Sequence, residues 1–80
     1  MDISLKIVSP METLIDTKVS IVTLPGRKGA FQVLKDHAPL LSSLSKGSIV
    51  YVDAEGEHTL DILSGFVKVL DNEVFAAVEQ

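Results

Sequence analysis

The residues that could take part in chemistry are two histidines, two adjacent cations and a set of carboxylates. His37 directly follows Asp36, and an imidazole beside a carboxylate is the pairing used for proton transfer. Neighbouring side chains do not usually reach each other in a productive geometry, and no serine has the setting of a nucleophile. We therefore interpret His37 as a residue that hydrogen-bonds the backbone of its own corner or contacts a partner, and we predict no catalytic residue.

The spacing of the metal-ligand types is also uninformative. His58 starts an extended segment after a polar turn, and it lies at no ligand spacing from the other histidine. The acidic residues near it are Asp53, Glu55, Glu57 and Asp61. They lack the loop pattern of a calcium site and are most simply solvated turn residues. We expect no metal site and no cofactor.

Two cations stand together in the turn Gly26-Arg27-Lys28-Gly29, and Lys35 follows one short strand later. A phosphate-binding loop would need Gly-Lys-Ser/Thr leading into a helix, whereas here a strand is expected to follow. One interpretation is a solvated turn. The other is a projecting contact whose charge meets a complementary partner.

The composition limits the class of protein. The 80 residues fit one domain, 1–80, of which 46% are hydrophobic and 5% aromatic. A net charge of -4 argues against nucleic-acid binding, and the absence of cysteine excludes disulfides and thiolate chemistry. No run is long enough for a membrane span and the amino terminus does not resemble a signal peptide, so we expect a cytoplasmic location without membrane insertion.

Alternating apolar residues predict strands at residues 2–8, 18–24, 31–34, 48–53, 58–63, 66–70 and 74–78. A short extended piece is expected at 14–15, and turns at 25–29, 54–57 and 71–73. Leu40, Leu41 and Leu44 have helical spacing, so at most one short helical turn is expected near residues 38–44. This pattern indicates an all-β fold, an antiparallel sandwich or barrel.

Several segments together resemble one family. They are Leu5 to Pro10, Val22-Thr23-Leu24-Pro25-Gly26, Gly29, Asp36-His37-Ala38-Pro39-Leu40-Leu41, Lys46-Gly47 and Leu63-Ser64-Gly65-Phe66-Val67-Lys68-Val69. They resemble the amino-terminal β-sandwich of the epsilon subunit of bacterial F-type ATP synthases, in register from near residue 3 to the end. The resemblance implies a flattened antiparallel β-sandwich in the central stalk, at the cytoplasmic face of the inner membrane.

The same resemblance implies partners and a task. The implied partners are the gamma subunit and the cytoplasmic loops of the c-ring, and the implied task is to couple ion translocation to ATP synthesis as a rotor part without chemistry. The positions that match ring contacts are Arg27, Lys28, Gly29, Ala30, Asp36, His37, Ala38 and Pro39. The isolated chain is expected to be monomeric, with an apolar sheet face for gamma.

The chain departs from the family pattern in two places. Family members often carry an acidic residue in the turn that holds Arg27 and Lys28 here, so the sign of the ring contact is in question. Members also often continue into a helical hairpin that restrains ATP hydrolysis, and we do not transfer that function because this chain stops at Gln80. Two alternatives remain: a β-sandwich adaptor for another soluble protein, and a small enzyme or ligand carrier using Asp36 and His37.

Overall fold

The computed structural model describes residues 1–80 and consists of nine β-strands without a helix. The strands are β1 (Ile3–Val8), β2 (Thr13–Val19), β3 (Ile21–Leu24), β4 (Phe31–Val33), β5 (Leu40–Leu44), β6 (Gly47–Asp53), β7 (Gly56–Ile62), β8 (Ser64–Leu70) and β9 (Glu73–Glu79). Period-2 alternation explains them, since β1 buries Ile3, Leu5 and Ile7 and turns the residues between them outward. The predicted all-β fold is confirmed.

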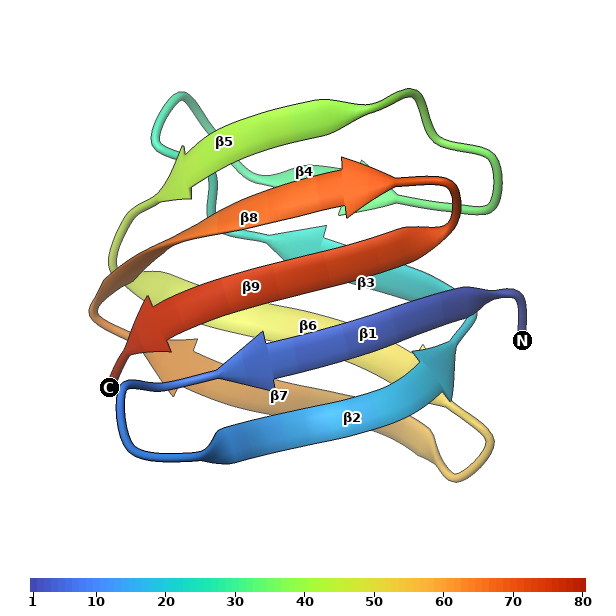
Figure 1. Cartoon of the computed structure of the whole chain (residues 1–80), viewed down its shortest axis with the longest axis horizontal. Helices are drawn as coiled ribbons and strands as arrows, with labels where there is room; N and C mark the ends of the chain where they lie inside the picture. The colour runs from blue at the N-terminus through green and yellow to red at the C-terminus, as the bar shows by residue number, and fades with distance from the viewer.

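The strands form two stacked sheets, which Figure 1 shows one in front of the other. The front sheet has the order β2-β1-β9-β8-β5, and the rear sheet has the order β4-β3-β6-β7. All neighbours are antiparallel except β1 and β9, which run parallel through the middle of the front sheet. The predicted antiparallel sandwich is therefore correct apart from this one pair.

The core lies between the two sheets and is entirely apolar. Sixteen buried residues form it: Ile3, Leu5, Ile7, Val19, Val22, Leu24, Val33, Leu44, Ile49, Tyr51, Ile62, Val67, Val69, Val74, Ala76 and Val78. No polar or charged residue is buried with them. Most of them are Val, Ile or Leu, whose side chains fill the space between two pleated faces closely, and such a core deforms little.

The segment predicted as one strand over 18–24 is two strands in different sheets. The chain leaves the front sheet after Val19 and enters the rear sheet at Ile21, and the Ser20 amide donates to the Val52 carbonyl at 2.9 Å. Val19 and Val22 are both buried although three positions separate them, because the alternation restarts in the second sheet.

The helical turn expected near residues 38–44 does not form. Leu40–Leu44 is strand β5, paired along its length with β8, and exposure alternates from Leu41 to Leu44. The leucine spacing fits both periods, and pairing with β8 selects the extended one because it satisfies the backbone of both strands. Pro39 precedes the first strand residue, where its missing N–H costs no ladder bond.

The hairpin turns are located where the sequence predicts them. Asp71 and Asn72 connect β8 to β9 with φ values of 49° and 62°, as a two-residue hairpin of the mirror-image type requires. Ala54 and Glu55 connect β6 to β7, and Gly56 follows with a φ of 119° that suits glycine. Both hairpins fix the register of the strands around them.

Candidate interaction surface

The first candidate segment, residues 27–30, is the exposed tip of the β3–β4 connection, which we call the cationic turn. Its base is anchored, since the Arg27 amide donates to the Ser43 carbonyl at 3.1 Å and the Gly29 amide donates to Gly26 at 3.0 Å. Gly29 has a φ of 129°, a conformation that a residue with a side chain rarely adopts. Arg27 and Lys28 are both exposed. The cations therefore project from a backbone that is tied to β5.

A hollow lies between the cationic turn and β5. It is lined by Gly26, Arg27, Lys28, Gly29, Ala30, Phe31, Leu40, Leu41, Ser42 and Ser43. None of these residues is acidic, in a chain whose formal net charge is -4. Positive charge and serine hydroxyls thus meet beside a small apolar floor, which suits contact with an anionic group.

The second candidate segment, residues 36–39, is the corner between β4 and β5. Asp36 has a φ of 63°, and its amide donates to Asn72 Oδ1 at 2.7 Å. Asn72 Nδ2 donates back to Asp36 Oδ1 at 3.1 Å, so two hydrogen bonds tie the corner to the β8–β9 hairpin. No local sequence pattern predicts this tie, because 36 positions separate the two residues.

The interpretation of His37 as a residue that bonds its own corner is confirmed. Its Nδ1 donates to the Ala38 carbonyl at 2.7 Å, and its amide donates to Leu34 at 3.2 Å. The carboxylate of Asp36 is engaged with Asn72 instead, so the two neighbours are not hydrogen-bonded to each other. The geometry gives no support to an acid-base pair.

The cationic turn and the corner do not meet. The turn lies beside Ser43 and Leu44 at the end of β5, whereas the corner leads into Leu40 at its beginning. Five strand residues separate them, or about 17 Å at the usual rise. Both lie along the upper edge of the molecule in Figure 1, at its two ends. They form two separate contact points on one edge.

Sequence reasoning expected an apolar sheet face but did not identify its residues. The outer side of the front sheet carries four large exposed side chains, which we call the apolar face: Leu41, Phe66, Leu70 and Phe75. Leu41 is 73% exposed. Lys68 lies on β8, opposite Leu41 of β5 on one side and Phe75 of β9 on the other. The sequence feature that could have identified the face is that β8 has apolar residues on both of its sides, which indicates a strand covered on two sides.

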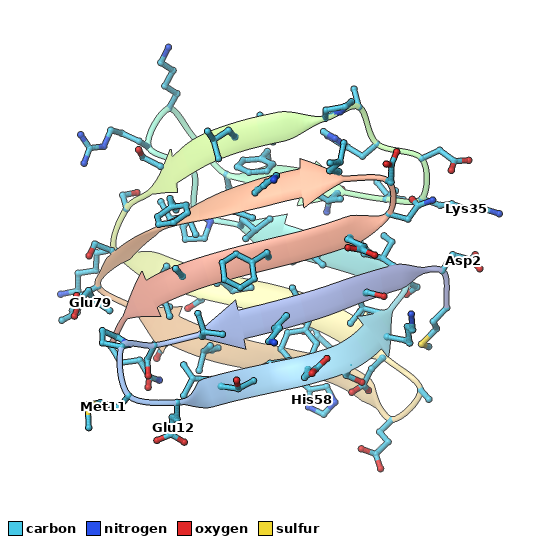
Figure 2. All side chains as sticks on the ribbon, viewed as in Figure 1. Asp2, Met11, Glu12, Lys35, His58 and Glu79 are labelled. Atoms are coloured by element: carbon cyan, nitrogen blue, oxygen red, sulfur yellow. The ribbon has the colours of Figure 1, made fainter.

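A second cluster lies at the opposite edge, in the β6–β7 hairpin. His58 Nε2 donates to Asp53 Oδ1 at 2.9 Å, and the His58 ring stacks on Tyr51 with ring centres 5.2 Å apart. The Glu55 amide donates to the same Asp53 oxygen at 2.8 Å. That bond, together with His58, lowers the pKa of Asp53, and burial raises the pKa of Tyr51. Figure 2 labels His58 at the lower edge of the sandwich.

These features together define a small two-sheet β-sandwich with one apolar face and two polar contact points on an adjoining edge. The structure contains no helix, and therefore none that could span a membrane.

The model of the β-sandwich domain of the ATP synthase delta/epsilon chain matches residues 2–80. The chain therefore belongs to this family. The resemblance seen in the sequence is therefore confirmed.

Relatives from several bacteria support the assignment. The ATP synthase epsilon chain of Desulfosudis oleivorans is 38% identical over 98% of this chain, and that of Sulfurovum sp. is 43% identical over 94%. The chain spans 59% of the length of each of these relatives. The epsilon chain of Chlorobaculum tepidum is 36% identical and is covered over 89% of its own length.

Solved structures share the fold. A chain in the mitochondrial ATP synthase of Euglena gracilis, in a structure of OSCP, F1 and c-ring, superposes with a TM-score of 0.90 at 23% identity. The superposition covers 99% of the present chain and 51% of the Euglena chain. A chain in the central stalk and c-ring structure from Tetrahymena thermophila gives a TM-score of 0.82 at 14% identity, over 100% and 65%.

Proposed function

We propose that this chain is a non-catalytic rotor domain of an F-type ATP synthase that joins the gamma subunit to the c-ring and so couples ion translocation to ATP synthesis. The family assignment supports this proposal, as do the names of the relatives and the central-stalk setting of the similar folds. The domain would act as a peripheral part of the complex at the cytoplasmic face of the bacterial inner membrane.

The observation that carries the proposal is the apolar face. Leu41, Phe66, Leu70 and Phe75 leave a group of large apolar side chains in water on one side of the front sheet. Soluble monomers rarely expose such groups unless a partner covers them. Lys68 and Glu73 lie among these residues and supply the polar groups that would fix the register of a partner. We assign this face to gamma.

The adjoining edge suits the c-ring. The cationic turn and the corner are held by backbone and side-chain hydrogen bonds at opposite ends of β5. Two separated contacts resist rotation of the domain on a partner better than one contact does, because each acts on a lever arm of roughly half of the 17 Å or so between them. The core between them is apolar and closely packed, so it transmits force with little internal strain.

The first experiment measures binding of the chain to the gamma subunit of its own organism by calorimetry. Phe66→Ser and Phe75→Ser remove exposed rings from the apolar face, and each should weaken binding about 10- to 100-fold, the usual effect of losing an aromatic anchor. Leu63→Ser is the matched control, since Leu63 is 54% exposed in a loop outside the face. Equal binding by all variants would refute the assignment of the face.

The second experiment adds the ring. Arg27→Glu with Lys28→Glu should weaken binding to a gamma and c-ring subcomplex and leave binding to gamma alone unchanged. Lys46→Glu is the control, because this exposed residue lies outside the hollow beside the cationic turn. If charge reversal left subcomplex binding intact, the cationic turn would not be a ring contact. If neither gamma nor the subcomplex bound the folded chain, a β-sandwich adaptor for another soluble protein would be the better interpretation.

A further inference from the structure

We propose that the β6–β7 hairpin binds a divalent transition-metal ion such as Zn²⁺, with His58, Asp53 and Glu55 as its protein ligands. β7 is the edge strand of the rear sheet, three strands away from β4. The site is therefore separate from the upper edge, and the inference does not depend on the proposed function.

The donor atoms already stand close together. One ligand atom from each of the three residues lies within 4.8 Å of the other two. Two ligands of one zinc ion, each at 2.0–2.2 Å, are about 2.8 to 3.6 Å apart at bond angles between 90° and tetrahedral. The Nε2 of His58 and the Oδ1 of Asp53 are 2.9 Å apart, which is near that spacing. The Glu55 side chain is exposed, so it is free to turn toward the other two ligands.

Two of the three ligands are held in place before an ion arrives. The Asp53 side chain is only 15% exposed, and the Glu55 amide fixes its carboxylate at 2.8 Å. The His58 ring lies against the Tyr51 ring with an angle of 27° between their planes. A two-residue loop joins β6 to β7, so the spacing of the ligands is set by the hairpin. This order lowers the entropy cost of binding.

The donor set selects the class of ion. One imidazole nitrogen with two carboxylate oxygens suits zinc and its neighbours in the first transition row, whereas Mg²⁺ and Ca²⁺ prefer oxygen alone. On binding, the ring proton moves from Nε2 to Nδ1, and the Nε2–H···Oδ1 hydrogen bond is replaced by two metal-ligand bonds. Water fills the remaining positions, as in zinc sites with three protein ligands.

Other charges near the hairpin do not block the site. Met1, Thr17 and Lys18 line a hollow together with Asp53 and Glu55. The ammonium group of Lys18 is directed to the Ser4 hydroxyl, to which it donates a hydrogen bond. The Lys18 cation of this hollow is therefore engaged with β1, the strand next to its own.

The test titrates the folded chain with zinc chloride by calorimetry in a buffer that does not bind zinc, and it follows the melting temperature in parallel. We expect one ion per chain, a rise in melting temperature with zinc, and no such rise with magnesium. Glu55→Gln and His58→Gln should each weaken binding at least tenfold. The matched controls are Glu57→Gln, on the outward side of the same strand, and His37→Gln, in the corner; both should bind as the parent does.

The possible results separate cleanly. Binding lost in both site variants and kept in both controls supports the site. No binding at millimolar zinc, or unchanged binding by His58→Gln, overturns it. Because His58 also packs on Tyr51, Glu55→Gln is the variant that leaves the hairpin contacts in place if His58→Gln fails to fold. Equal loss in the His37→Gln control would assign the ion to the corner and also overturn the proposal.

Discussion

Asn72 holds a candidate contact point in position from a distant hairpin, so replacing it should loosen the corner. Its side chain makes two hydrogen bonds with Asp36, at 2.7 and 3.1 Å, and its φ is 62°. Exposed bonds of this kind contribute at the low end of about 0.5 to 1.5 kcal/mol each. Asn72→Gly loses both bonds and keeps an easy backbone, so it should cost about 1 kcal/mol. Asn72→Ala adds a left-handed backbone penalty of roughly 1 kcal/mol, for a total of about 2 kcal/mol.

Thermal unfolding checks these values, since 1 kcal/mol corresponds to a fall of about 4 to 8 °C in melting temperature for a domain of this size. Hydrogen exchange of the Asp36 amide reports on the tie itself, and exchange should become faster in both variants. Asp71→Gly is the control, because Asp71 has the same left-handed backbone with a φ of 49° but no bond to the corner. If the Asp36 amide stayed protected in Asn72→Gly, the corner would be held by something other than this tie.

Three further predictions concern the fold. Gly65→Ala should cost about 1 to 3 kcal/mol in urea unfolding, because an added Cβ would lie 2.4 Å from the Ala77 carbonyl oxygen; unchanged stability would mean that β8 shifts freely. Leu5→Ala should cost about 2 to 5 kcal/mol, since Leu5 is fully buried, and a loss under 1 kcal/mol would contradict the core described. The lowered pKa of Asp53 means that its bond from the Glu55 amide stabilises the fold above pH 3.8 and is lost as the pH falls through the lower folded value. Unfolding of the parent and Asp53→Asn should therefore converge in acid, and a constant gap down to pH 2 would argue against that cause.

Most of the fold could be predicted from short-range patterns in the sequence. The alternation in Ile3–Val8 identified a half-buried strand, and Asp71-Asn72 identified a hairpin, because both depend on residues that are neighbours in the chain. The change of sheet at Ser20 could not be predicted in this way. Burial alternates normally on each side of Ser20, and only the positions that are buried change from odd-numbered to even-numbered residues. The helical spacing of Leu40, Leu41 and Leu44 was overruled by pairing with a strand that comes 20 residues later.

The candidate sites show the same limit. The sequence singled out the cationic turn and the corner by composition, but it could not tell that they lie at opposite ends of β5. It also gave no reason to group Asp53, Glu55 and His58, because a hairpin register, and not their spacing, brings their ligand atoms together. The tie between Asp36 and Asn72 is longer still in sequence and depends on how the β4–β5 corner meets the β8–β9 hairpin.

The parallel pairing of β1 with β9 has a consequence for how the chain reaches its native state. β9 lies between β1 and β8, so β1 must wait for the ninth strand of the sandwich before the front sheet is continuous. Until residues 73–79 have emerged, the β1–β2 hairpin has a free edge and an apolar side open to water. Contacts this distant in the chain slow folding to the range of milliseconds to seconds. We expect a nascent chain that lacks β9 to be bound by chaperones or degraded. Release from chaperones would then depend on the pairing of β9 with β1 and β8.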